Sequence, residues 1–150
     1  MLAFSIRSAA IEDVDSIHAL IAELAEFERA SHELVTTPDS LREVLFAPQP
    51  WVWAWVAEVD CKVVGAALVY KRYSTWKGPV LYLEDFVVQS ECRSQGIGAQ
   101  LFETCLGFGR EQGCSRMVWQ VLDWNTEAQR FYQRYGAQFE PGWYNAALEL

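Results

Sequence analysis

The sequence lacks several features that would assign it to a common class of protein. It has no apolar run near the ~20 residues that a membrane-spanning helix needs. Positive charge is also scarce, with 12 lysines and arginines against 20 aspartates and glutamates, for a net charge of −8. We therefore expect neither a membrane nor a nucleic acid as a partner, because an acidic surface repels phosphate. The same charge favours cationic small molecules or basic protein segments.

Cysteine and histidine are too few and too scattered to indicate a disulfide framework or a metal centre. No C-x-x-C pair occurs among the four cysteines, Cys61, Cys92, Cys105 and Cys114. Reduced thiols in a cytoplasmic protein are therefore expected, and residues 1–3 are expected to open a strand and not a signal peptide. His18 and His32 have no partners at ligand spacing, so we expect no metal.

Apolar residues are abundant. They make up 51% of the sequence, with seven tryptophans, eight phenylalanines and six tyrosines, which argues against disorder. A chain of 150 residues is large enough for a real core, and we expect one domain over residues 1–150.

Hydrophobic periodicity predicts ten elements in the order βααβββαβαβ. Strands are expected near residues 2–6, 51–56, 63–73, 81–88, 117–122 and 139–148. Helices are expected near residues 11–27 and 38–45, then from residue 97 to a stop at Gly113, and from a cap at Asn125 to a stop at Gly136. This order suggests a mixed sheet covered by helices, in an α/β or α+β domain.

Three tryptophans alternate along one predicted strand: Trp51, Trp53 and Trp55. Such a row could form a platform for a ligand. Packing in a core or an interface is more common, and we favour that interpretation.

Residues 81–88 are typical of a central strand, because both predicted faces are mostly apolar. Alternation places Tyr82, Phe86 and Val88 on one face and Leu81, Leu83 and Val87 on the other. Two carboxylates, Glu84 and Asp85, interrupt this strand, and burying a carboxylate is costly unless it is paired or has a function. The strand therefore holds a candidate catalytic carboxylate.

Residues 93–98 form the pattern Arg-x-x-Gly-x-Gly where the next helix is predicted to begin. A helix N-terminus attracts phosphate, and glycine lets the backbone approach the anion closely. The pattern is not a Walker loop, because Ala99 and Gln100 replace the required Lys-Ser or Lys-Thr, and Leu101 replaces the third glycine of a dinucleotide site. Alone, it could also be a tight turn with a solvated arginine.

In this context the pattern resembles the acetyl-CoA loop of the GCN5-related N-acetyltransferase (GNAT) superfamily. Leu-Tyr-Leu-Glu-Asp-Phe at residues 81–86 resembles the spermidine/spermine and thialysine acetyltransferase branch. The resemblance continues in Trp-Asn-x5-Phe-Tyr at residues 124–132 and Glu-Leu-Ala-x-Phe-Glu at residues 23–28. It implies a GNAT fold, with a mixed, mostly antiparallel sheet splayed between its fourth and fifth strands and flanked by helices. It also implies a homodimer.

Acetyl transfer to an amine needs a neutral amine, stabilisation of charge on the thioester oxygen, and an acid for the leaving thiolate. An alkylamine has a pKa near ~10.4, so a glutamate at ~4.3 is too weak to deprotonate it efficiently. Glu84 would need a raised pKa, a water relay, or a role limited to anchoring the ammonium ion. A tyrosine at ~10 suits a thiolate at ~8.5. The resemblance assigns Glu84 as the water-relayed base and Tyr132 as the acid, although Tyr132 could also be a core aromatic.

The resemblance further implies which residues contact each substrate. For acetyl-CoA they are Phe86, Val87, Val88, Arg93, Ser94, Gln95, Gly96, Ile97, Gly98, Ala99, Asn125, Thr126, Glu127, Ala128 and Tyr132. For the amine they are Phe27, Glu28, Glu84, Val118, Trp119 and Gln120.

The expected acceptor is a small cationic amine: a diamine, a polyamine or a lysine-like amino acid such as thialysine. Acids gather after the first predicted helix, at Glu23, Glu26, Glu28 and Glu33, and form either an amine site or a solvated face. Phe27 replaces the usual tyrosine of spermidine acetylases, and the C-terminal segment is shorter, which favours lysine-like amines over spermine. The alternatives are a protein lysine or N-terminal acetyltransferase, and a catalytically silent CoA-binding regulator.

Overall fold

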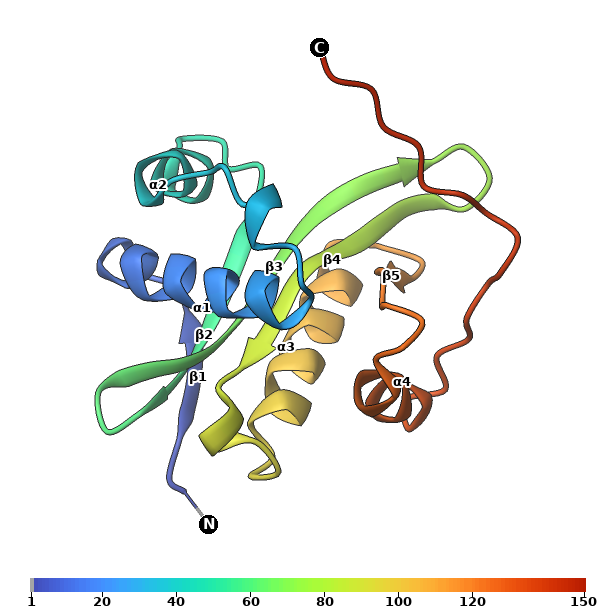
Figure 1. Ribbon diagram of the computed structural model, residues 1–150. Helices are drawn as coiled ribbons and strands as arrows, with labels where there is room; N and C mark the ends of the chain where they lie inside the picture. The colour runs from blue at the N-terminus through green and yellow to red at the C-terminus, as the bar shows by residue number, and fades with distance from the viewer. Residues whose placement is uncertain (1) are drawn as a thin grey trace. The chain divides into compact units, whose positions relative to one another are not determined.

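The computed structural model describes residues 2–150 of the chain, coloured from the N- to the C-terminus in Figure 1. Its contacts divide the chain into two compact units, Met1–Gln120 and Val121–Leu150. Within the described part, no helix is both long and apolar enough to cross a membrane.

The first unit is built on a five-stranded sheet in the order β1-β2-β3-β4-β5. The first four strands pair antiparallel, and β4 pairs with β5 in parallel. The strands are β1 (Ser5–Ser8), β2 (Trp53–Val59), β3 (Lys62–Ser74), β4 (Gly78–Val88) and β5 (Met117–Val118). The mixed, mostly antiparallel sheet that the sequence predicted is confirmed, although β1 begins later than expected and β5 is shorter.

Helices cover both faces of this sheet (Figure 1). On one face, α1 (Val14–Phe27) and α2 (Pro38–Phe46) enclose a core that includes Ile17, Leu45 and Leu68. On the other face lies α3 (Ile97–Glu111), whose Phe108 packs on Trp53 and Trp55 at ring-centroid distances of 5.4 and 4.9 Å. The packing interpretation is confirmed for these two tryptophans.

The ends of α1 and α2 are fixed by local hydrogen bonds. Thr37 caps α2 by accepting from the Ser40 N–H, and Pro38 follows at the first helical position, as predicted. After α1, Arg29 takes a φ of +59°, and the Ala30 N–H bonds to the Ala25 carbonyl at 2.8 Å. This is a Schellman ending. It holds Phe27 and the residue after it, Glu28, in place.

The central strand contains a β-bulge that the sequence did not reveal. In the β3–β4 pairing, Leu68 is opposite Asp85 and Val69 is opposite Leu83, so Glu84 is an extra residue in β4. An extra residue shifts the two-residue alternation of side chains.

The bulge makes the predicted faces of this strand wrong beyond Glu84. Leu81 and Phe86 both contact α3, whereas Val87 belongs to the core beneath α1 and α2. Phe86 therefore shares a face with Leu81 and not with Tyr82, and Val87 lies on the face opposite Leu81.

The second unit contains α4 (Thr126–Gln133), capped by the Asn125 side chain, which accepts from the Ala128 N–H at 3.2 Å. The cap and the helix agree with the sequence prediction. The closing strand expected over residues 139–148 is wrong, because the described chain forms no strand there. Pro141 has no N–H for a ladder, and Gly142 takes a φ of +98°, so an extended run is interrupted at this point.

Candidate active site

The β4 bulge turns two consecutive carboxylates toward the same side of the sheet. Alternation from Tyr82 places Glu84 on the α1 face, and alternation back from Val87 places Asp85 on that face as well. Glu84 is exposed and Asp85 is half-buried. Burial, together with the charges of Glu84 and Glu28, raises the pKa of the Asp85 carboxyl to about 6.

A third carboxylate reaches this place from the end of α1. Glu28 is half-buried, and burial raises the pKa of its carboxyl. Its charge acts on Asp85. The structure therefore brings together Glu28 and Glu84, two of the residues predicted to meet the amine, and adds Asp85. The charges of Glu84 and Glu28 disfavour the ionised form of Asp85, and a bound cation would relieve that repulsion.

We define the acidic cluster as Glu28, Glu84 and Asp85. Two tyrosines lie beside it. Tyr70 and Tyr82 pair across β3 and β4, with ring centroids 5.1 Å apart. Burial raises the pKa of both phenols, and the charge of Glu84 raises it further. Neither ring was predicted as a site residue, and Asp85 was predicted without a role of its own. The only signals were the Glu-Asp doublet and the position of Tyr82 two residues before Glu84.

Strand β4 continues past the point where its pairing with β5 ends. The pairing joins Leu81 to Met117 and Tyr82 to Val118, whereas β4 runs on to Val88. This is the expected splay.

The buried Phe102 of α3 contacts the residues on both sides of the splay. Its ring lies 5.8 Å from that of Phe86 and 5.5 Å from that of Trp119. Of the residues expected near the amine, Val118 therefore lies in β5, Trp119 packs on α3, and the exposed Gln120 follows.

The predicted phosphate loop leads directly into α3. Ser94 and Gly96 take φ angles of +60° and +87°, which turn the chain sharply before Ile97. In the described chain, the first turn of α3 has no acidic residue, and Gly96 offers no side-chain cap. The N–H groups of a first helical turn have no intrahelical acceptor, so this end suits an external anion such as a pyrophosphate.

Arg93 is held at the entrance of this loop. Its Nε donates to the Val88 carbonyl at 3.0 Å, and its Cζ lies 5.8 Å from the centre of the Phe27 ring. Phe27, expected to meet the amine, thus contacts an arginine expected to meet the cofactor.

The second unit carries the remaining predicted residues. Asn125 caps α4, and Thr126, Glu127 and Ala128 form its first turn. Tyr132 is the buried residue of the helix, with its ring 5.4 Å from that of Phe131.

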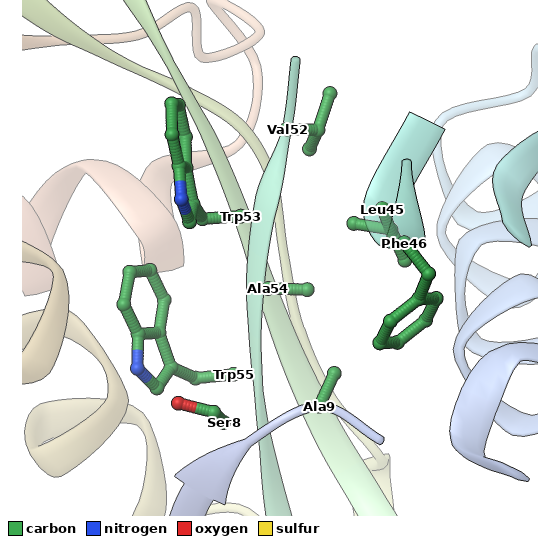
Figure 2. A pocket seen from close by; sticks show the side chains of 8 residues that line it. All are labelled: Ser8, Ala9, Leu45, Phe46, Val52, Trp53, Ala54 and Trp55. Carbon is green, nitrogen blue, oxygen red and sulfur yellow. The ribbon is translucent and has the colours of Figure 1, made fainter. Parts of the chain in front are cut away.

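An apolar hollow at the edge of β2 lies apart from these residues. Figure 2 shows Trp53 and Trp55 on one side of the strand, and Leu45 and Phe46 of α2 on the other. None of the predicted site residues lines it, and it contains no carboxylate. We therefore do not place the active site there.

Comparison with known proteins identifies the class. The profile described as the acetyltransferase (GNAT) family matches residues 17–137. An aminoglycoside N-acetyltransferase solved in complex with CoA has the same fold, with a TM-score of 0.79 at 21% identity over 98% of this chain and 96% of that one. The chain belongs to the acetyltransferase (GNAT) family and is an acetyltransferase.

Its relatives narrow the position within the family. A thialysine N-epsilon-acetyltransferase of Bos taurus is 39% identical over 89% of this chain and 83% of the relative. Spermidine/spermine N(1)-acetyltransferase-like protein 1 of Homo sapiens is 32% identical over 94% of this chain and 22% of that protein. The chain thus lies in the spermidine/thialysine acetyltransferase branch, as the sequence motifs predicted.

Proposed function

We propose that this acetyltransferase transfers an acetyl group from acetyl-CoA directly to the primary amine of a small cationic molecule. The acceptor is a diamine, a polyamine or a lysine-like amino acid such as thialysine. The acidic cluster of Glu28, Glu84 and Asp85 carries the proposal, because it joins three carboxylates from two elements on one face of the sheet. The relatives named for thialysine and spermidine/spermine support the same chemistry.

The residues of the first unit fit acetyl-CoA. Arg93, Gly96 and the first turn of α3 would hold the pyrophosphate, and the backbone of residues 86–88 would pair with the pantetheine arm as an added strand does. When bound, acetyl-CoA supplies the acetyl thioester that reacts with the amine. Residues 125–128 are proposed as contacts from the second unit.

The acidic cluster would bind the acceptor through its charge. A distal cation pairs with Glu28 or Asp85 while the reacting nitrogen approaches Glu84. Each partly exposed pair contributes about 1 kcal/mol or less, so we expect a preference among amines and not absolute specificity. The faces of Tyr70 and Tyr82 offer the alkyl chain an apolar surface and an ammonium group a cation–π contact.

We assign proton transfer to two residues, Glu84 and Tyr132. Glu84 accepts the proton of the substrate ammonium through a water molecule, or anchors the ammonium ion while bulk water takes the proton. The neutral nitrogen attacks the thioester carbonyl, and the C–N bond forms as the C–S bond breaks. Tyr132 donates its phenolic proton from Oη to the leaving sulfur, and the second proton that the nitrogen loses as the amide forms restores the phenol of Tyr132 through solvent.

The experiment is a CoA-release assay with a diamine and a lysine-containing peptide side by side, using the parent, Glu84→Gln and Glu43→Gln. Glu43 is an exposed acid of α2 outside the cluster, so its variant controls for the loss of one charge. We expect diamine turnover to fall about 10²-fold or more in Glu84→Gln and to stay unchanged in Glu43→Gln. Turnover of the peptide but not of the diamine would instead indicate a protein acetyltransferase.

The same assay separates the two roles of Glu84. If Glu84 is a base, Glu84→Gln lowers kcat, and the decrease in kcat is larger at lower pH, where the amine is more fully protonated. If Glu84 is only an anchor, Glu84→Gln raises the amine KM and leaves kcat unchanged.

A further inference from the structure

Helix α1 ends between the two halves of the proposed site. Its last residue, Phe27, contacts Arg93 of the phosphate loop, and the next residue, Glu28, belongs to the acidic cluster. The two neighbours thus serve different partners. The Schellman ending, with Arg29 at a φ of +59°, fixes this division, because it sets the direction in which each side chain leaves the helix.

Arg93 needs such a neighbour. It is an exposed side chain with several rotatable bonds, and ordering it on phosphate costs conformational entropy. In this structure it is already restrained at two places, by the Val88 carbonyl 3.0 Å from Nε and by the ring of Phe27 at 5.8 Å. The hydrogen bond engages Nε, and a phosphate is bound by the outer Nη groups of a guanidinium.

Phe27 is not part of the buried core. Its side chain is 45% exposed although it is a large aromatic at the end of a helix. A cation over an aromatic face at this distance is a favourable contact, whether or not the cation also binds an anion.

We infer that Phe27 is a positioning residue of the acetyl-CoA site, acting through Arg93, and that it does not contact the amine. Its ring holds the guanidinium near the first turn of α3 before acetyl-CoA arrives. The inference rests on the proposed function, because it requires that Arg93 binds the pyrophosphate.

The experiment is a double-mutant cycle with Phe27→Leu and Arg93→Gln, read by calorimetry as the Kd for acetyl-CoA. We expect Phe27→Leu to raise this Kd about two- to five-fold, the range of an exposed cation–π pair, and Phe27→Tyr to restore it, because the ring is kept. In the Arg93→Gln background, Phe27→Leu should have no further effect, because the residue through which it acts is gone. The amine KM at saturating acetyl-CoA should stay at the parent value in Phe27→Leu.

Phe46→Leu is the matched control. Phe46 is also the last residue of its helix, α2, and is 38% exposed, but it lies outside the proposed site. Its replacement should leave the acetyl-CoA Kd unchanged.

The results separate the inference from the proposal beneath it. An unchanged acetyl-CoA Kd in Arg93→Gln would overturn the pyrophosphate assignment. A higher acetyl-CoA Kd in Arg93→Gln, combined with an unchanged Kd in Phe27→Leu, would overturn only the role of Phe27. An increase in the amine KM of Phe27→Leu would show that Phe27 belongs to the acceptor site. Equal effects of Phe27→Leu on the acetyl-CoA Kd in both backgrounds would show that Phe27 contributes only to packing.

Discussion

Glu84 and Asp85 are adjacent in the chain, and the bulge in β4 gives them different surroundings on one face of the sheet. Glu84 is exposed, while Asp85 is half-buried with a pKa raised to about 6, first by burial and then by neighbouring negative charge. A carboxylate whose pKa is raised by burial and by neighbouring negative charge is typical of a functional site.

We predict that Asp85→Asn makes the protein without substrates more stable and a poorer enzyme. An acid whose folded pKa is raised binds more protons when folded than when unfolded, so stability falls as pH rises from 3.8 to about 6 and stays lower above that range. Removing the charge should therefore stabilise the fold by on the order of 1–3 kcal/mol at pH 7.5 and by less at pH 4.5. Amine kcat/KM should fall at the same time.

Thermal unfolding at the two pH values, with Asp123→Asn as a control on an exposed aspartate, measures this effect. A gain in Tm that does not change with pH would contradict the assignment of the raised pKa to Asp85.

Tyr132→Phe tests the proposed acid by removing one hydroxyl and keeping the ring. We expect kcat to fall about 10²-fold with little change in acetyl-CoA affinity, because the phenol acts on the leaving sulfur and not on binding. Steady-state kinetics and calorimetry on the same preparation give both quantities. A kcat within about threefold of the parent would make Tyr132 a packing residue, since general acids contribute more than that.

Sequence patterns located part of this site. Glu84 and Glu28 followed from motifs at residues 81–86 and 23–28. The sequence could not predict on which face of the sheet Phe86 and Val87 lie. The bulge depends on how β3 pairs with β4, and the hydrophobic periodicity of β4 alone does not indicate it. Asp85 escaped for the same reason, since regular alternation would place it on the face opposite Glu84.

At the scale of elements, the sequence predicted correctly those features that depend only on neighbouring residues. Thr37 and Asn125 begin helices by capping them, as their positions predicted. A strand needs a neighbouring strand to pair with as well as a hydrophobic pattern, and this explains the two wrong strand predictions. In the described chain, β5 stops at Val118, where its pairing with β4 ends, and residues 139–148 form no strand despite their apolar content.

The start of α3 can be tested with two glycines of the same helix. Gly98→Val places a branched side chain in the first turn, where phosphate needs bare backbone, and should weaken acetyl-CoA binding about tenfold or more, which is about 1.4 kcal/mol. Gly107→Val is the matched control, because a Cβ at Gly107 meets no atom within 4 Å. Calorimetry on the two folded variants should separate them, and equal affinity in both would show that the loop assignment is wrong.

At the scale of the whole molecule, we predict a two-fold homodimer. The β3–β4 hairpin exposes Tyr73 and Trp76, at 73% and 86% of their surfaces. Its turn is ordered, because Ser74 Oγ accepts from the N–H groups of Trp76 and Lys77 at 3.2 and 3.1 Å. Rigidly presented apolar side chains favour an interface.

Light scattering at micromolar concentration should give twice the chain mass of 17.1 kDa for the parent, and Trp76→Ser should shift it toward the monomer. A monomer in the parent would refute the dimer. A dimer unaffected by Trp76→Ser would move the interface away from the hairpin.

The net charge of −8 is distributed unevenly, and this bears on the substrate. Between Asp60 and Glu84 the sequence has four basic residues and no acidic one, so the negative charge belongs to the rest of the chain, including the end of α1. A cationic amine would therefore be drawn to the acidic cluster and not to the hairpin.

The most direct test of this account is kcat/KM for thialysine, putrescine, spermidine, spermine and an alkylamine with a neutral tail of similar length, each measured with the parent and with Glu28→Gln. We expect the cationic amines to exceed the neutral-tailed amine by about fivefold or more, which corresponds to ~1 kcal/mol for one partly exposed ion pair. Lysine-like amines should have a higher kcat/KM than spermine. Glu28→Gln should reduce the difference in kcat/KM between the cationic amines and the neutral-tailed amine. Equal or better turnover of the neutral-tailed amine by the parent, or an unaltered ranking in Glu28→Gln, would contradict the claim that the acidic cluster selects the substrate.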